Sequence, residues 1–153
     1  MRLLSEEQAE KVFNDNLKIA HDILGKSVTL TSQLDKAGKT FFKNRYIGTF
    51  AADEIPDNFI CDDNYQYMIV NNETRDHGGE HWVAVANTSG VLHVFDSFGR
   101  PTKDLIPSLY AMGTVKDSDY DKDQKETQED CGSRCIAWLM LFDKYGAENA
   151  LLI

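Results

Sequence analysis

Seven consecutive apolar residues, 136–142, follow a polar and acidic segment that ends at Cys131-Gly132. A helix over such a run has no polar face, so it must be buried on most sides. Cys131 would then stand in the first turn of that helix, where unpaired N–H groups and the positive end of the helix dipole favour a thiolate. Gly132 lets another backbone approach closely. The pattern therefore predicts a cysteine nucleophile where a buried helix begins.

Apolar residues at helical spacing predict two helices near the N-terminus. Ser5 and Gln8 form a capping box, and Gly25 is a natural helix end, so the first helix should span residues 6–24. A second start signal at residues 29–32 predicts a short helix that ends at Phe42.

Runs of β-branched and aromatic residues predict a sheet in the middle of the chain. The expected strands are residues 45–50, 65–70, 81–86 and 91–95, with a strand-like piece at 114–115 after a helical stretch at 105–112. Helices first, a meandering sheet next and a buried helix last predict an α+β fold. We expect a central, mostly antiparallel sheet that packs against the buried nucleophile helix and the N-terminal helices.

The expected hairpin brings a histidine to a carboxylate. If Asn87 pairs with Gly90 across a two-residue turn, His81 faces Asp96 directly, with Cβ atoms about 5 Å apart. A carboxylate placed in this way fixes the tautomer of an imidazole and stabilises its protonated form. If Gly90 instead belongs to a bulged three-residue loop, the register shifts by one residue and Asp96 moves to the other face. Both registers are compatible with the sequence.

Gln124 precedes Cys131 on the segment that leads into the predicted nucleophile helix. Its side-chain amide N–H and the backbone N–H of Cys131 could together hold a tetrahedral oxyanion, and loss of one such donor costs about 10²–10³ in rate. Gln128 is closer in sequence and is the rival for this role. Alternatively, either glutamine is a solvent-exposed loop residue that does not bind the oxyanion.

Composition and charge narrow the possible classes of protein. A chain of 153 residues is long enough for one domain with a proper core, which we expect to span residues 1–153. The net charge of −9 argues against a broad nucleic-acid surface, and no apolar run approaches the ~20 residues needed to cross a bilayer. Three cysteines cannot all pair, so reduced thiols in the cytoplasm, the nucleus or a particle are expected.

Three motifs suggest metal chemistry, and each departs from what that chemistry requires. Residues 77–81 match the inverted zinc-protease pattern, but two central glycines disfavour the helix it needs. Residues 117–128 begin like an EF-hand loop, yet Lys122 occupies the position of the required glycine. Cys131 and Cys135 lack the usual zinc spacing. We therefore expect no metal and no cofactor.

Several segments taken together resemble one known family. They are, in chain order, Tyr46–Phe50, Met68–Asn71, Gly78–Trp82, Val94–Gly99 and Gln124–Gly132. Their combination over about residues 30–142 resembles the adenain family, the adenovirus-type maturation proteases that also occur in virophages and Maverick or Polinton elements. The Ulp-type SUMO proteases are more distant relatives of that family.

The resemblance implies a papain-like, adenain-type cysteine endopeptidase. It makes His81 the base, Asp96 the residue that orients it, Cys131 the nucleophile and Gln124 an oxyanion donor. It also implies cleavage of viral capsid or structural precursor proteins after glycine during virion maturation, by a monomer in the virion and the host-cell cytoplasm (viral factory) or nucleus. A Ulp-type isopeptidase acting on SUMO or ubiquitin conjugates would use the same residues, and a non-catalytic scaffold would keep only the fold.

Two features depart from the adenovirus enzyme, which is basic and is stimulated by DNA and by a disulfide-linked peptide. This chain is acidic, and it has no cysteine between Asp96 and Gln124, where such a peptide would attach. We therefore carry over neither cofactor: nucleic acid and membrane are not expected as partners, and an activating peptide is left open.

Overall fold

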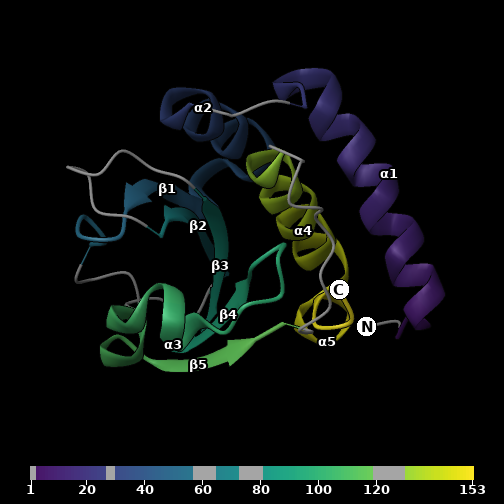
Figure 1. The fold of residues 1–153 in the computed structure, drawn as a ribbon. Coiled ribbons are helices and arrows are strands. Elements are labelled where there is room, and N and C mark those ends of the chain that lie inside the picture. The colour runs from purple at the N-terminus through teal and green to yellow at the C-terminus, as the bar shows by residue number, and fades with distance from the viewer. Residues whose placement is uncertain (1–2, 27–29, 57–64, 73–80, 119–129) are drawn as a thin grey trace.

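The computed structural model describes residues 3–26, 30–56, 65–72, 81–118 and 130–153. The elements in these residues are, in chain order, α1 (Glu6–Leu24), α2 (Thr31–Phe42), the 3₁₀ helix η1 (Lys43–Arg45), β1 (Tyr46–Ala51), β2 (Gln66–Asn71), β3 (Trp82–Thr88), β4 (Val91–Phe95), α3 (Thr102–Leu105), the 3₁₀ helix η3 (Pro107–Ala111), β5 (Thr114–Asp117), α4 (Cys131–Tyr145) and α5 (Ala147–Ala150). Figure 1 shows α4 between the sheet and α1. No described helix is long and apolar enough to cross a membrane.

Both N-terminal helices have a side-chain cap at their start: a full capping box in α1, and in α2 only the hydrogen bond from a backbone N–H to a glutamine. At the start of α1, the Ser5 hydroxyl accepts from the Gln8 backbone N–H at 3.1 Å, and the Gln8 side chain accepts from the Ser5 N–H at 2.9 Å. Gly25 ends α1 with φ at 82°, so the predicted span of residues 6–24 is confirmed. The second helix starts slightly before its predicted core, because Gln33 accepts the Leu30 N–H at 2.8 Å and caps the helix there.

The described strands form one mixed sheet in the order β1-β2-β3-β4-β5. The two central pairings, β2 with β3 and β3 with β4, are antiparallel, whereas β1 pairs with β2 and β4 with β5 in parallel. The α+β class is therefore confirmed, but the expectation of a mostly antiparallel sheet is wrong. Parallel neighbours need a crossover rather than a hairpin, and residues 96–113 make such a crossover through α3 and η3.

Helix α4 is buried on nearly all sides, as its unbroken apolar run predicts. One surface packs on the sheet, where Trp138 stacks against Phe95 with ring centroids 5.5 Å apart. The opposite surface lies under α1 (Figure 1), and α5 closes the C-terminal end, where the Trp138 indole N–H donates to the Ala150 carbonyl at 3.0 Å. The first turn of α4 is thereby held between the sheet and two N-terminal helices.

A second apolar cluster fills the other face of the sheet. There Ile106 and Leu109, from the α3–η3 segment, pack on valines of the central strands. The helix expected over residues 105–112 is instead the shorter 3₁₀ helix η3, which Pro107 begins because it has no N–H with which to continue the separate helix α3.

His93 is buried on the face of the sheet that packs against α4, and its protonation should make the stability of the fold depend on pH. It is 5% exposed, its Nε2 lies 3.1 Å from the Thr88 hydroxyl, and its Nδ1 has no partner in the described part of the chain. Burial, together with the charge of Lys116, lowers the pKa of His93 to about 4. Protonation of this buried imidazole therefore lowers the free energy of unfolding.

We expect the free energy of unfolding to fall as pH drops from about 6.5 towards 4. In that window the unfolded chain binds a proton at His93 that the folded protein does not, and the full effect is at most roughly 3 kcal/mol. Urea unfolding at pH 7, 5.5 and 4 measures it, with His93→Gln as the comparison. An identical pH dependence in the wild type and in this variant would contradict the assignment.

Candidate active site

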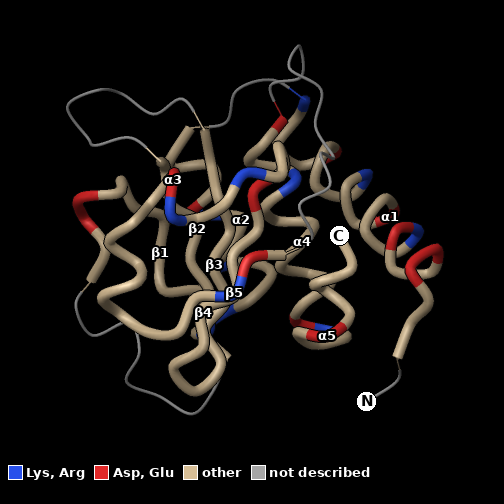
Figure 2. The backbone as a smooth tube through the Cα atoms, turned by 60° about the horizontal axis from the view of Figure 1, so that its bottom comes forward, with Lys and Arg blue, Asp and Glu red and all other residues tan. Residues whose placement is uncertain are grey.

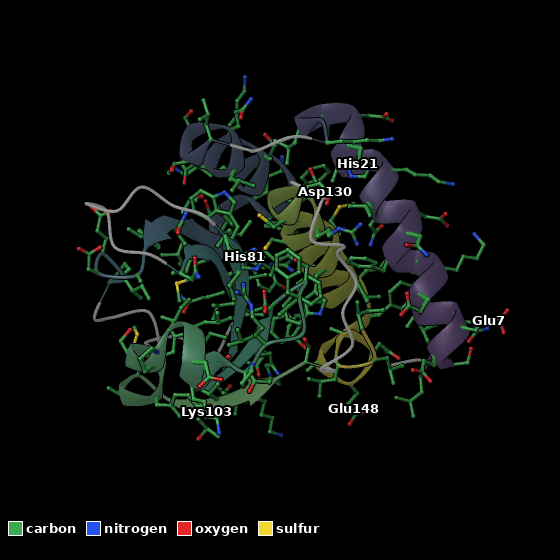
Figure 3. The ribbon with its side chains drawn as sticks, in the orientation of Figure 1. Glu7, His21, His81, Lys103, Asp130 and Glu148 are labelled. Carbon is green, nitrogen blue, oxygen red and sulfur yellow. The ribbon has the colours of Figure 1, made fainter. Side chains whose placement is uncertain are left out.

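His81 and Asp96 meet at one end of the central hairpin. His81 immediately precedes β3 and Asp96 immediately follows β4, so the antiparallel pairing brings the two residues to the same end of the sheet. His81 Nε2 forms a hydrogen bond and ion pair with Asp96 Oδ1, and both side chains are buried. Figure 3 shows His81 on the sheet side of α4.

The hairpin register differs from both registers that the sequence allows. The turn residues are Ser89 and Gly90, with φ of 52° and 89°, the positive values of a tight two-residue hairpin turn. Continuing this register places Val83, rather than His81, opposite Asp96. The shift from direct pairing is two residues, which keeps His81 and Asp96 on one face as diagonal neighbours. The predicted contact forms, although the predicted pairing is wrong.

Asp96 is held as a carboxylate by its own turn. Its Oδ2 accepts from the Arg100 backbone N–H at 2.9 Å and from Arg100 Nε at 3.0 Å, while its carbonyl accepts from the Gly99 N–H at 2.9 Å. Burial raises the pKa of the Asp96 carboxyl, but hydrogen bonds from His81 and Arg100 outweigh burial and lower it to about 2. Asp96 is therefore ionised at neutral pH.

Phe98 covers the histidine from the same turn. Its ring centroid lies 4.9 Å from that of His81, and the Arg100 guanidinium lies 5.2 Å from the Phe98 centroid. The Phe98 side chain is half-buried and packs against the imidazole. The segment 95–100 thus orients His81 by a charge, a hydrogen bond and an aromatic contact.

Cys131 completes the arrangement. It is the first residue of α4 and is 8% exposed, whereas Cys135, one turn further, is fully buried, which raises the pKa of its thiol well above the ordinary value. Burial lowers the pKa of His81, but hydrogen bonds with Asp96 and the Cys131 thiol outweigh burial and raise it above 6.5. Since Nε2 of His81 faces Asp96, Nδ1 is the ring nitrogen left for the thiol.

A thiol, an imidazole and a carboxylate therefore lie in series where a buried helix begins, which is the arrangement for thiol-based acyl transfer. The family model of the adenovirus endoprotease matches residues 46–136, which is more than half of the chain. The chain belongs to the adenovirus endoprotease family. It is a viral cysteine endopeptidase, a hydrolase of peptide bonds. No curated protein matches the chain.

Other residues that the sequence singles out in this endopeptidase lie outside the described residues. These are Gln124 and Gln128, the two candidate oxyanion donors, together with Cys61, His77 and Glu80. The choice between the two glutamines therefore stays a prediction. Within the described residues, no group of three or more His, Cys, Asp or Glu side chains is arranged to hold a metal ion.

Two contacts near the active site are not predicted by the sequence. Arg100 binds Asp96, and its spacing of four residues after the carboxylate, just beyond the Phe-Asp-Ser-Phe-Gly turn, is a signal that could have found it. His21 pairs with Asp130 at 2.8 Å, and no local pattern predicts that contact, because tertiary packing of α1 on α4 brings the two residues together.

Proposed function

We propose that Cys131, His81 and Asp96 carry out peptide-bond cleavage through a thioester. One observation carries the proposal: the imidazole of His81 is hydrogen-bonded to the Asp96 carboxylate, and the Cys131 thiol at the N-terminus of α4 lies near enough to help raise the pKa of His81. A base joined to its nucleophile and to an orienting group is the geometry of nucleophilic catalysis in cysteine proteases.

The reaction follows from these contacts. Nδ1 of His81 takes the proton of Cys131 Sγ, and the thiolate attacks the carbonyl carbon of the scissile bond. Backbone N–H groups at the start of α4, with Gln124 as the second donor, stabilise the oxyanion. His81 gives its proton to the leaving amine, and the substrate's acyl group remains on sulfur as a thioester. His81 then deprotonates a water that attacks the thioester, which releases the acid and restores the thiol.

Asp96 makes His81 suitable for both proton transfers. Its ionised carboxylate accepts a hydrogen bond from Nε2–H and so fixes the tautomer that leaves Nδ1 towards sulfur. The same charge stabilises the imidazolium that accompanies the thiolate, in agreement with the raised pKa of His81. Asp96 does not itself exchange a proton, because its pKa of about 2 keeps it ionised throughout.

The proposed substrates are viral capsid or structural precursor proteins, cut after glycine during virion maturation. Membership of the adenovirus endoprotease family supports a viral protein substrate. We further propose that a single domain acts as a monomer, in the virion and in the host-cell cytoplasm or nucleus. Acidic residues outnumber lysines along α1 (Figure 2) and the net charge is −9, which supports action without a nucleic-acid cofactor.

Glycine preference is tested by matched peptides that differ at one residue. We expect internal peptides with glycine before the scissile bond to be cleaved with kcat/KM at least about 10-fold above the same peptides with leucine there, because a narrow subsite excludes the side chain. Cleavage is followed by mass spectrometry of the two products.

Diglycine-ended ubiquitin-like proteins, assayed in parallel, separate the endopeptidase from the isopeptidase that would use the same residues. Faster turnover of those proteins than of any internal peptide would contradict the proposed substrate class. Equal cleavage of the glycine and leucine peptides would contradict the specificity alone.

A further inference from the structure

Asp130, the residue directly before Cys131, makes a buried ionic contact with the N-terminal helix. Its Oδ2 lies 2.8 Å from Nε2 of His21 on α1, and its Oδ1 accepts from Arg134 Nε on α4 at 3.0 Å. Asp130 is 3% exposed. Figure 3 shows His21 and Asp130 facing each other where the C-terminal half of α1 lies beside the start of α4.

The Asp130 side chain does not cap the helix that it precedes. An aspartate in this position commonly accepts hydrogen bonds from N–H groups of the first turn. Asp130 occupies the cap position of α4 but makes no such side-chain bond, because both of its oxygens are directed to His21 and Arg134. The N–H groups beside Cys131 are therefore not covered by this carboxylate. These groups stabilise a thiolate and an oxyanion there.

The cluster also balances a charge that would oppose the chemistry. A buried carboxylate next to a cysteine disfavours the thiolate by like-charge repulsion. Asp130 is buried, with the guanidinium of Arg134 and the ring of His21 against its two oxygens. A single acid thereby joins α1 to the nucleophile helix without leaving an unpaired negative charge.

We propose that His21, Asp130 and Arg134 are positioning residues that hold Cys131 in line with His81. His21 contacts neither His81 nor Cys131 in the hydrogen bonds above, and it acts through Asp130, the backbone neighbour of the nucleophile. The inference rests on the proposed role of Cys131. The proposed active site then includes a residue of α1, a helix that lies outside the residues matched by the family model.

Variants of His21 test the proposal, with Asn16 as the matched control. In His21→Leu and His21→Asn the contact with Asp130 is lost, whereas the amide nitrogen of His21→Gln takes the place of Nε2 and keeps it. Asn16 joins the same two helices at a distance from the nucleophile, through a 3.3 Å hydrogen bond to the Ala137 carbonyl. Asn16→Ala therefore weakens helix docking without touching the cluster.

Two readouts are measured: kcat and KM on a glycine peptide, and the rate at which iodoacetamide alkylates Cys131 between pH 5 and 9. We expect His21→Leu and His21→Asn to lower kcat by about 10- to 100-fold, with KM changed less than about twofold, because misplacement of a reacting group acts on the chemical step. Alkylation of Cys131 at neutral pH should slow in parallel. His21→Gln should recover most of both rates, and Asn16→Ala should change only the free energy of unfolding.

The proposal is overturned if His21→Asn, folded by circular dichroism, keeps wild-type kcat and alkylation rate, or if Asn16→Ala lowers kcat as much as His21→Asn does. Either result would make the contact an ordinary helix-docking interaction. A failure of the proposed function has a different signature: Cys131→Ala would then cleave the peptide as well as the wild type. The alkylation profile of the His21 variants would still decide the role of the cluster in that case.

Discussion

Replacing Cys131 by alanine is expected to lower kcat for peptide cleavage by at least about 10⁴-fold. Alanine has no atom that can form the thioester, so only the slow reaction that binding and the oxyanion donors support on their own would remain. The protein should still fold, because Cys131 is the first residue of α4 and the change removes one sulfur atom from the edge of the core. The residual rate is measured by mass spectrometry after long incubation at high enzyme concentration.

Cys135→Ala is the matched control, because Cys135 is the same residue type one turn along the same helix. It is fully buried and its thiol pKa is raised well above the ordinary value, so it has no route to substrate. Its loss should reduce the free energy of unfolding by about 1–2 kcal/mol through a small cavity, with kcat retained. The assignment fails if Cys135→Ala abolishes cleavage while Cys131→Ala retains it.

Replacing Asp96 by asparagine is expected to lower kcat by about 10²–10⁴-fold and to move the alkaline limb of the pH profile to lower pH. Asparagine keeps the shape but loses the charge and no longer fixes the productive tautomer of His81. In the wild type, hydrogen bonding to Asp96 raises the pKa of His81 above 6.5, so the imidazolium persists as pH rises through that value. Without the carboxylate that pKa falls, and the imidazolium is lost at a lower pH.

The measurement is kcat/KM between pH 5 and 10 for the wild type, Asp96→Asn and Arg100→Gln. Arg100→Gln loses the guanidinium but keeps the backbone N–H that donates to Asp96, so its kcat/KM should fall far less. An Asp96→Asn profile with an unchanged alkaline limb would mean that Asp96 does not govern the protonation of His81.

The features predicted correctly from the sequence are those that local chemistry determines. The capping box at Ser5 and the glycine at residue 25 bound α1, and seven apolar residues in a row require burial of α4 wherever the chain places it. The contact between His81 and Asp96 is one of the two outcomes that the sequence allows, because the two residues flank the open end of one hairpin and share a face in every second register.

The features that the sequence does not predict depend on turn conformation and on contacts between segments far apart in the chain. The hairpin turn places Ser89, a non-glycine residue, at a φ of 52°, and the Asn87 side chain accepts the Gly90 N–H at 3.0 Å. The parallel edges of the sheet follow from crossovers whose direction no periodicity records. The cluster of His21, Asp130 and Arg134 exists only once α1 has packed on α4.

The most direct test of the central claim uses a short peptide whose C-terminal glycine carboxylate is replaced by a vinyl sulfone, which reacts with an activated thiolate. The protein is incubated with this reagent at pH 7, digested and mapped by mass spectrometry. The His81–Cys131 pairing predicts one adduct, on Cys131, formed at least about 100-fold more slowly in His81→Gln. An adduct on Cys61 or Cys135 instead, or equal labelling of Cys131 with and without His81, would contradict it.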